Sequence, residues 1–362
     1  MSLTKYQHVL AEVMKRLHSG EWPVGAKIPS GRALAQDFGC CAVTIERVVR
    51  TLMDDGMLRR ESRKGTYVAP REQWHRQQAA SPQRRLIGVM TEFPYIDLQQ
   101  IDATLRERNY AMVVRHTHDH IDTALQAIHE FSQLGVSGIL WSPLSTSNHR
   151  ADNALLADAI LASRLPSVAI DRYPEDVEVQ YVVSDNAQAG YTLTKYLLDL
   201  GHRRIGLVRH IHGSTPDDRH RGYTRALRAA GIDANDNLVF TIGHEVNTQE
   251  VITRLRAWLR AIRPTAAWAI AGYPLGNALL AAAQAEGLHI PDDLSIASFD
   301  EIIAPFPMTS IMQPFEQMAY RAATLLCDQI EHPTDELYRI VLRSTLRVGA
   351  SCAPPAADPI VR

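Results

Sequence analysis

Three segments near the beginning of the chain have apolar residues at helical spacing. The first spans residues 6–17 and ends before Gly20, and the second follows Ser30, a residue type that commonly caps helix N-termini. A third helix is predicted after Gly39. Its apolar stripe has the spacing i, i+3, i+4, i+7 and comprises Ile45, Val48, Val49 and Leu52. The opposite face of this helix is therefore short-chained and basic.

Two strand-like runs, residues 57–61 and 66–69, follow these helices and bracket a turn that carries Arg63 and Lys64. Three helices followed by a basic hairpin predict a winged helix-turn-helix domain over residues 1–69. In that fold the third helix can enter a major groove while the wing approaches the DNA backbone.

A different pattern begins at residue 86, where apolar strand-like runs alternate with amphipathic stretches of helical length. This alternation predicts an α/β fold with doubly wound parallel sheets, and its length favours two lobes over one. Within a two-lobed domain of residues 86–349, we expect lobe 1 at about 86–184 plus a late crossover segment, and lobe 2 at about 185–310. The strand-like runs lie near residues 86–91, 111–114, 138–141, 167–170, 205–208, 238–242, 266–271 and 294–299.

Residues 70–85 separate the two patterns. They are polar, include two prolines and show no apolar period, which is typical of an interdomain linker. At the other end of the chain, residues 350–362 are expected to form a C-terminal tail.

Charge is distributed unevenly along the chain. Residues 1–85 carry 15 Lys and Arg against 8 Asp and Glu, a net of +7, whereas the remainder carries 23 against 32, a net of −9. A polyanionic partner is therefore expected at the N-terminal domain. No segment reaches the roughly 18 uninterrupted apolar residues of a membrane span, and the polar start lacks a secretory apolar core. We therefore expect a cytoplasmic protein without membrane contact, whose four cysteines are reduced thiols.

The N-terminal domain carries a dense set of motifs: Gly20-x-Trp22-Pro23-x-Gly25, Ile28-Pro29-Ser30-x-Arg32-x-Leu34-Ala35, Phe38-Gly39, Thr44-Ile45, Gly56-x-Leu58 and Gly65-Thr66-Tyr67-Val68. These motifs resemble those of the GntR family of DNA-binding proteins. The resemblance implies operator DNA as the partner, contacted mostly at its phosphates. The implied contact residues are Lys27, Ser30, Arg32, Thr44, Arg47, Arg63, Lys64 and Thr66.

The turn before the third helix departs from the family pattern. Cys40-Cys41-Ala42 stands where the family usually has Val-Ser-Arg, and Glu46 where it often has Arg. Alanine cannot make the bidentate contact that arginine makes with guanine. Two explanations stay open: the operator differs from typical family sites, or Glu46 and Arg47 contact the bases, with Glu46 accepting from cytosine. The adjacent cysteines are interpreted as small packing residues rather than as a redox switch.

The second domain carries its own ordered motifs: Ile87-Gly88-Val89, Gly135-Val136-x-Gly138-Ile139, Pro166-x-Val168-x-Ile170-Asp171-Arg172, Val183-Ser184-Asp185-Asn186-x-x-x-Gly190, Leu200-Gly201-His202-Arg203-Arg204-Ile205, Arg221-Gly222-Tyr223, Ile290-Pro291-x-Asp293-Leu294-Ser295-Ile296, Phe299-Asp300 and Thr309-Ser310-Ile311-x-Gln313-Pro314. They resemble the LacI/GalR effector-binding domain, which is related to periplasmic sugar-binding proteins. Together the two domains resemble hybrid sugar-responsive regulators of the arabinose-repressor type. This resemblance implies a homodimer that binds a small molecule between its lobes.

The same resemblance places four side chains in the effector cleft. Arg219 falls where the family has an effector-gripping arginine, and Asp300 where a carboxylate often takes sugar hydroxyls. Asp171 and Phe315 match a polar and an apolar cleft position. Bidentate acceptors and forked donors beside an apolar platform suit a polyol.

Three aromatic residues are further candidates for contact with the effector. Phe93 and Tyr95 follow the first strand of the two-lobed domain and are candidates for the platform under a sugar ring. Tyr273 ends Ala271-Gly272-Tyr273, where the family commonly has Ala-Asn-Asp, so a hydroxyl-binding pair is lost. Tyr273 either stacks on the effector or simply packs.

Other polar residues near strand ends have structural interpretations. Asp185 precedes a helix and is interpreted as its cap, whereas no helix follows Asp300, which favours the cleft. His202 is interpreted as a structural turn residue. A loop carries His116, His118 and His120 without a cysteine or a second matching cluster, so no metal site is predicted.

The resemblances imply a DNA-binding transcriptional regulator, a repressor whose binding to a pseudo-palindromic operator is controlled by a sugar or sugar derivative that either relieves or promotes it. One alternative is a constitutive repressor whose sensing domain has lost its ligand. Another is a regulator that responds to a non-sugar effector such as a nucleoside. The sequence contains no P-loop, no GxGxxG after a strand, no GxSxG elbow and no HExxH, so neither an enzyme nor a cofactor is predicted.

Overall fold

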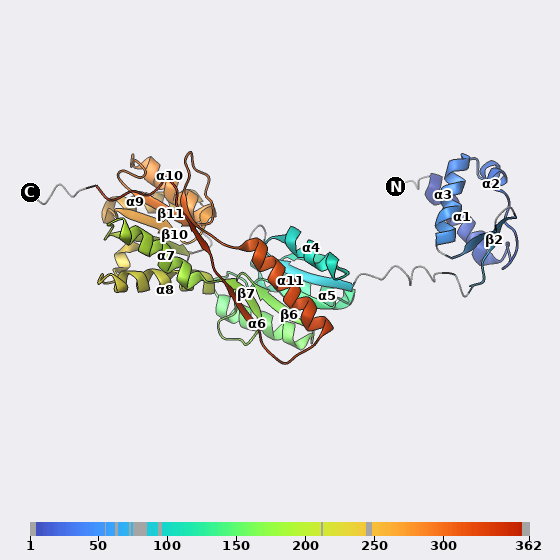
Figure 1. Cartoon of the computed structure of the whole chain (residues 1–362), viewed down its shortest axis with the longest axis horizontal. Coiled ribbons are helices and arrows are strands. Elements are labelled where there is room, and N and C mark those ends of the chain that lie inside the picture. Colours follow the sequence, from blue (N-terminus) through green and yellow to red (C-terminus); the bar gives the residue numbers. More distant parts are fainter. Residues whose placement is uncertain are drawn as a thin grey trace, which may run out of the picture. The chain divides into compact units, whose positions relative to one another are not determined.

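The computed structural model describes residues 5–54, 56–61, 64–71, 74, 85–92, 96–210, 213–243 and 248–356. The chain divides into two units, residues 1–84 and 85–362 (Figure 1). Among the described helices, none combines the length and the apolar character that crossing a lipid bilayer requires.

The first unit contains three helices and a hairpin, as the sequence predicts for a winged helix-turn-helix. Its elements are α1 (Lys5–Ser19), α2 (Gly31–Asp37), α3 (Ala42–Asp54), β1 (Leu58–Glu61) and β2 (Gly65–Val68). Helix α2 begins after Ser30, whose hydroxyl accepts a hydrogen bond from Ala33 N at 3.2 Å and so caps the helix. The two strands pair antiparallel, with Leu58 opposite Val68.

The predicted apolar stripe of α3 lies in the core of the first unit. All four of its residues are buried, and they share that core with the inward stripe of α1, which includes Val9, Val13 and Leu17. The opposite side of α3 is exposed and carries Ala42, Val43, Glu46, Arg47 and Arg50. The amphipathic character expected of the third helix is thereby confirmed.

Trp74 extends the first unit beyond the boundary expected from the sequence. From the sequence, this residue is expected in a linker over residues 70–85, but its side chain is only 9% exposed, and its Nε1 donates to Ala69 O at 2.8 Å. Indole combines a large apolar surface with one N–H donor. The first unit supplies both the apolar neighbours and the carbonyl, so Trp74 belongs to its core.

The second unit consists of two lobes, each built on a six-stranded sheet. The strands of lobe 1 are β3 (Arg85–Thr91), β4 (Tyr110–His116), β5 (Gly138–Trp141), β6 (Ser167–Ile170), β7 (Tyr181–Ser184) and β13 (Arg339–Leu342). Those of lobe 2 are β8 (Ile205–His210), β9 (Val239–Ile242), β10 (Ala266–Ala269), β11 (Ser295–Phe299), β12 (Thr309–Met312) and β14 (Thr345–Arg347). The strand orders are β13-β7-β6-β5-β3-β4 and β14-β12-β11-β10-β8-β9. All neighbours are parallel except β12 and β14.

Every strand-like run predicted in the second domain falls on one of these strands, which confirms the doubly wound fold. The strands that the sequence analysis missed are β7, β12, β13 and β14. Each has only three or four residues, and β13 and β14 alternate between exposed and half-buried positions. The alternation of β13 and β14 leaves no apolar run to detect, whereas β7 and β12 are mostly buried and have polar residues within or at the end of their four positions.

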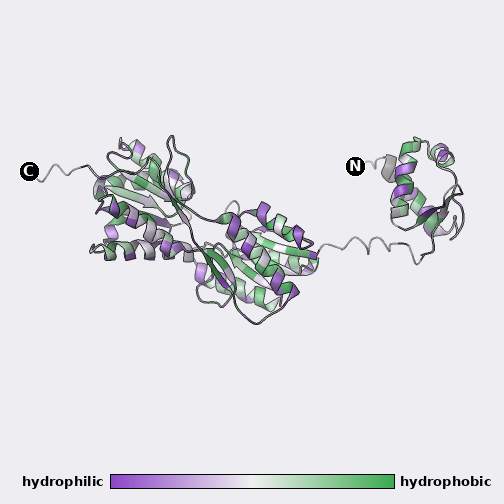
Figure 2. Ribbon diagram, in the orientation of Figure 1, coloured by the Kyte–Doolittle hydropathy of each residue, from purple (hydrophilic) through white to green (hydrophobic). Residues whose placement is uncertain are grey.

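Amphipathic helices cover both faces of each sheet, with hydrophilic residues beside hydrophobic ones along their length (Figures 1 and 2). In lobe 1, the pairs are α4 (Leu98–Glu107) with α11 (Phe315–Glu331), and α5 (Ile121–Leu134) with α6 (His149–Ala162). In lobe 2, they are α7 (Asn186–Asp199) with α8 (Ser214–Ala229), and α9 (Thr248–Ile262) with α10 (Asn277–Ala285). Two short turns, η2 (Asp236–Leu238) and the π-helical η3 (Gly272–Gly276), complete lobe 2.

The chain passes between the lobes at three places. The crossings lie between β7 and α7, between β12 and α11, and between β13 and β14. Because each lobe keeps its own core, a change in the angle between the lobes has to be absorbed at these crossings.

The segment expected to be a C-terminal tail packs on lobe 2 as far as residue 356. Ser351 is fully buried, and its hydroxyl accepts from Thr309 N at 2.8 Å. His202 is also buried, and its Nε2 donates to Ala353 O at 2.9 Å. This packing is not predictable from a sequence pattern, because the segment has no periodic apolar residues and is held by hydrogen bonds instead.

Helices α7 and α8 approach each other closely at two glycines. A Cβ atom added at Gly222 would overlap the carbonyl oxygen of Ala187, and one added at Gly190 would overlap that of Arg219. Only glycine permits this backbone approach. The packing therefore fixes the position of α8, and with it Arg219, against α7.

Replacing Gly222 with Ala should lower the free energy of unfolding by about 1–3 kcal/mol, because the added methyl group pushes two packed helices apart. Urea denaturation of the full-length protein measures this loss. Gly243→Ala is the matched control, since a Cβ at that position meets no atom within 4 Å. Equal stability of the two variants would contradict the close packing of α7 and α8.

Candidate functional site

A cavity of about 330 Å³ lies between the two lobes of the second unit. Strand ends and helix starts of both lobes form its walls, together with the crossover between β12 and α11. Lobe 2 contributes an apolar wall that includes Ile242, Val251, Ile270 and Leu275. The charged lining residues are Glu92, Asp119, Asp171, Arg172, Arg219 and Asp300. A cavity with an apolar wall and a few charged groups is typical of a small-molecule site.

Asp171 and Asp300 occupy equivalent positions in the two lobes. Each directly follows the third strand of its sheet, β6 or β11, and has a positive φ, 72° for Asp171 and 57° for Asp300. Each backbone N–H also donates to the neighbouring strand, that of Asp171 to Val182 O at 3.0 Å and that of Asp300 to Ile311 O at 2.7 Å. Aspartate tolerates this left-handed conformation better than most residues. The matching turns place one carboxylate from each lobe in the cavity wall.

Arg219 is a buried cation at the centre of the lobe 2 wall, with only 4% of its surface exposed. Its Nε donates to Asn186 Oδ1 at 2.8 Å, and its guanidinium also donates to the carbonyl of Ile270. The guanidinium carbon lies 3.8 Å from the centre of the Phe299 ring. Burial lowers the pKa of Arg219 to about 10, against the opposing influence of Asp300 and Asp171. Arg219 therefore remains charged at neutral pH.

The two cleft carboxylates have direct partners other than Arg219. Asp171 lies 3.5 Å from Nε of Arg172, and Asp300 accepts from Gln313 Nε2 at 2.8 Å. Burial raises the pKa of both carboxyls, while the positive charge of Arg219 acts to lower them. One forked donor and two acceptors thus line the same cavity from both lobes.

Three further polar atoms in the cavity wall are buried and have no hydrogen-bond partner among the described residues. They are Oε2 of Glu92, Oγ1 of Thr215 and Oε1 of Gln313. Buried polar atoms in native proteins are normally hydrogen-bonded, so these atoms suit contact with a polar ligand or water. The sequence analysis missed all three, although Glu92 directly follows a predicted strand, a position that could have identified it.

The structure describes only some of the other residues expected at the effector site. Phe315 lines the cavity at the first turn of α11. Phe93 and Tyr95 lie outside the described residues. The backbone of Tyr273 belongs to η3, and its side chain lies outside the described part of the structure.

The structural interpretation of Asp185 is confirmed, because its side chain accepts from Gln188 N at 2.9 Å and caps α7. The Nδ1 atom of His118 lies 3.9 Å from Oε1 of Glu92, a residue of the cavity wall. Within the described ranges, no group of three or more His, Cys, Asp or Glu side chains converges on a common point.

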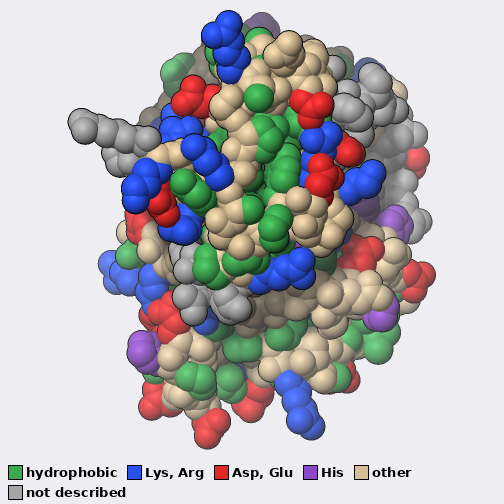
Figure 3. Space-filling view, turned by 90° about the vertical axis from the view of Figure 1, so that its right-hand side faces the viewer, with side chains coloured by type: hydrophobic (Ala, Val, Ile, Leu, Met, Phe, Trp, Pro, Cys, Tyr) green, Lys and Arg blue, Asp and Glu red, His purple; other side chains and the backbone are tan. Residues whose placement is uncertain are grey.

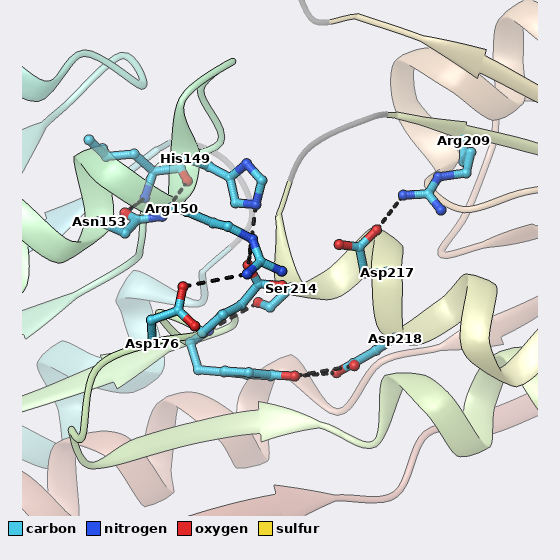
Figure 4. A network of polar contacts seen from close by, with 11 residues as sticks. His149, Arg150, Asn153, Asp176, Arg209, Ser214, Asp217 and Asp218 are labelled. Atoms are coloured by element: carbon cyan, nitrogen blue, oxygen red, sulfur yellow. Dashed lines mark hydrogen bonds and ion pairs between the residues drawn. The ribbon is translucent and has the colours of Figure 1, made fainter.

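A polar network also joins the two lobes beside the cavity (Figure 4). The hydroxyl of Tyr173, in the loop after β6, donates to Asp218 on α8 at 3.0 Å, and Tyr173 N donates to Ser214 Oγ at 3.3 Å. Within lobe 1, Arg150 pairs with Glu175 and Asp176 and holds the same loop. Helix α8 therefore carries the cavity arginine, Arg219, next to the residue that ties lobe 2 to lobe 1.

In the first unit, most of the residues expected to contact DNA lie at the surface. Those that are exposed are Lys27, Ser30, Arg32, Glu46, Arg47 and Lys64. Figure 3 shows Lys and Arg side chains (blue) interspersed with acidic (red) and hydrophobic ones (green) on one face of the molecule.

The remaining candidate DNA contacts are partly covered or undescribed. Thr44 is half-buried, and its Oγ1 lies 3.1 Å from Sγ of Cys41, a hydrogen bond that lowers the pKa of the Cys41 thiol. Thr66 is half-buried on β2, whereas Arg63 lies outside the described residues. Lys64 lies at the end of the wing, 3.8 Å from a carboxylate oxygen of Glu61.

Comparisons with known proteins agree with this two-part organisation. Residues 5–68 match the family model described as bacterial regulatory proteins, gntR family, and residues 194–352 match that of a periplasmic binding protein-like domain. The chain thus joins a gntR-family DNA-binding domain to a periplasmic-binding-protein-like domain, which confirms the resemblances inferred from its motifs.

Its relatives include transcriptional repressors. The chain is 26% identical over 367 residues to the arabinose metabolism transcriptional repressor of Geobacillus stearothermophilus, covering 97% of this chain and 98% of that one. It is 30% identical over 205 residues to the ribose operon repressor of Haemophilus influenzae, covering 54% and 59%. It also resembles the solved complex of the transcriptional regulator CelR with cellobiose, with 25% identity, a TM-score of 0.64, and 90% and 100% coverage. The domains and relatives define a transcription regulator.

Replacing Asp300 with Asn should reduce the loss of stability that the ligand-free protein shows as pH rises from about 4 to 7. Burial raises the folded-state pKa of Asp300 above the unfolded value of 3.8. The stability that this carboxyl contributes is therefore fully present below the unfolded pKa and is lost as pH rises through the folded pKa. Urea denaturation of both proteins from about pH 4 to pH 7 measures this change. A variant that loses stability relative to the wild type as pH rises would show that burial is not the main influence on the pKa of Asp300.

Proposed function

We propose that this protein is a transcriptional repressor whose binding to operator DNA is controlled by a sugar or sugar derivative bound between its lobes. The winged helix-turn-helix supplies the DNA contacts, with Lys27, Ser30, Arg32, Thr44, Glu46, Arg47, Arg63, Lys64 and Thr66 as the candidate residues. The protein acts in the cytoplasm and has no catalytic role in this proposal. The names of its relatives, repressors of arabinose metabolism and of a ribose operon, support this assignment.

The observation that carries the proposal is the polar lining of the interlobe cavity. Arg219 offers forked donors, Asp171 and Asp300 offer bidentate acceptors, and an apolar wall lies beside them. Sugar hydroxyls act as both donors and acceptors, so one polyol can satisfy all three groups. The unpartnered atoms of Glu92 and Thr215 add further hydroxyl positions. This lining favours a sugar over a nucleoside and argues against a sensing domain that has lost its ligand.

Effector binding is expected to change the closure of the lobes. A ligand held by Asp171 of lobe 1 and by Arg219 and Asp300 of lobe 2 draws the two strand ends together. Asp218, which accepts a hydrogen bond from Tyr173 of lobe 1, lies on the same helix as Arg219. This contact should therefore respond to the same movement. We propose that two chains pair and present their winged helices to a pseudo-palindromic operator. A coupling of about 1–3 kcal/mol is typical, and operator DNA must alter effector affinity by the same factor.

Replacing Arg47 with Ala should weaken binding to the DNA upstream of the protein's own gene by about tenfold or more, a loss of about 1.4 kcal/mol. The reason is the removal of a cation from the outward face of α3. Fluorescence anisotropy at fixed salt measures the affinity, and Thr44→Ala is expected to act in the same direction. Arg106→Ala, which removes an exposed cation from α4, is the control and should bind normally. If the Arg47 variant also loses its thermal stabilisation by sugar, the division into two independent modules is wrong.

Replacing Arg219 with Lys should weaken effector binding about tenfold or more, because lysine keeps the charge but lacks the forked donors. A thermal-shift screen with arabinose, ribose, cellobiose and adenosine first identifies the ligand, and calorimetry then measures its affinity. DNA binding by this variant should persist without responding to the ligand. Arg225→Lys, exposed on the same helix, is the matched control. An unchanged response in the Arg219 variant would move the effector site elsewhere, and stabilisation by adenosine alone would identify a non-sugar effector.

A further inference from the structure

The outward face of α3 begins with an uncharged, apolar tip. Val43 is 77% exposed in the first turn of the helix, next to the exposed Ala42. One exposed stripe runs down the helix from this tip at the spacing i, i+3, i+4, i+7 and comprises Val43, Glu46, Arg47 and Arg50. This stripe lies on the opposite side of the helix from the buried one.

Neither packing nor helix stability accounts for a valine at this position. The side chain lies outside the core of the first unit, and β-branched valine favours a helix less than alanine does. Among the described residues of the first unit, the exposed large hydrophobic side chains are Val24 and Val43. Val24 lies in a turn, so Val43 is the one that a helix presents.

The neighbours of Val43 indicate that the tip of α3 faces base edges rather than phosphates. The side chains of Val43 and Ala42 have no donor for a phosphate, and the carboxylate of Glu46, one turn further on, is repelled by phosphates. In recognition helices of this architecture, the N-terminal residues contact the base edges in the major groove. The apolar group that a base pair presents there is the C5-methyl group of thymine.

We propose that Val43 is a specificity-determining residue that recognises a thymine in each operator half-site through contact with its C5-methyl group. This inference rests on the proposed function, because it requires α3 to enter the major groove of operator DNA. The inference also bears on Ala42, which stands where the GntR family usually has arginine. An arginine there would select guanine, whereas the apolar tip of this helix selects a methyl group.

The test replaces thymines by deoxyuridine, which removes only the methyl group. A duplex is first selected from a random-sequence library with the full-length protein, and each thymine in a half-site is then replaced in turn. At one position the wild type should lose about fourfold in affinity for each methyl group removed, the value expected for one buried carbon. Val43→Ala, which changes both chains of the dimer, should bind the thymine duplex about as weakly as the wild type binds a duplex with deoxyuridine in both half-sites, and should show no further loss with deoxyuridine. Val24→Ala, the matched control, should keep the full effect of deoxyuridine.

The outcomes separate this inference from the proposed function. A wild type that selects a duplex but is indifferent to every deoxyuridine contradicts the role of Val43 and leaves the repressor intact. The same holds if Val43→Ala and the wild type lose equal affinity at the sensitive position. Failure to select any duplex overturns the proposed function and, with it, this inference. Val43→Thr, which keeps one methyl group, should retain part of the deoxyuridine effect, and its complete loss in that variant would also count against the methyl contact.

Discussion

The burial of the Arg219 charge is the constraint on which the effector-binding unit depends. A buried guanidinium is destabilising unless hydrogen bonds and opposite charges surround it. Here α7 supplies Asn186, β11 supplies the Phe299 ring, and the two lobes each supply one carboxylate, Asp171 and Asp300. These partners come from separate segments of the chain and from both lobes, so the surroundings of the buried charge depend on how both lobes line the cavity.

Helix α8 connects Arg219 with a contact between the two lobes. Successive residues of a helix point in different directions, so Arg219 faces the cavity while the adjacent Asp218 reaches Tyr173 of lobe 1. The close approach of α7 and α8 at Gly190 and Gly222 prevents α8 from shifting independently. In the proposed mechanism, a ligand that pulls on Arg219 acts on this helix pair, and the three crossings between the lobes absorb the movement.

Much of this organisation is predictable from the sequence because it depends on local patterns. The stripe of α3, the Ser30 cap and the strand-like runs of the second domain follow from residue types a few positions apart. The motifs singled out Arg219, Asp171 and Asp300, and the structure brings all three into one cavity. Sequence patterns did not predict contacts that lack a period. Trp74 was expected in the linker and Ser351 in the tail, but both side chains are buried.

The sequence by itself determined the order of the domains, the positions of the main helices and strands, and the charge that separates the DNA-binding part from the rest. Only the tertiary structure decided which strand ends share a cavity, that the carboxyls of Asp171 and Asp300 have raised pKa values, and that Glu92 has an unpartnered oxygen there. It also decided the contact of Tyr173 with α8. These features depend on burial and on neighbours far apart in the chain, which no local period encodes.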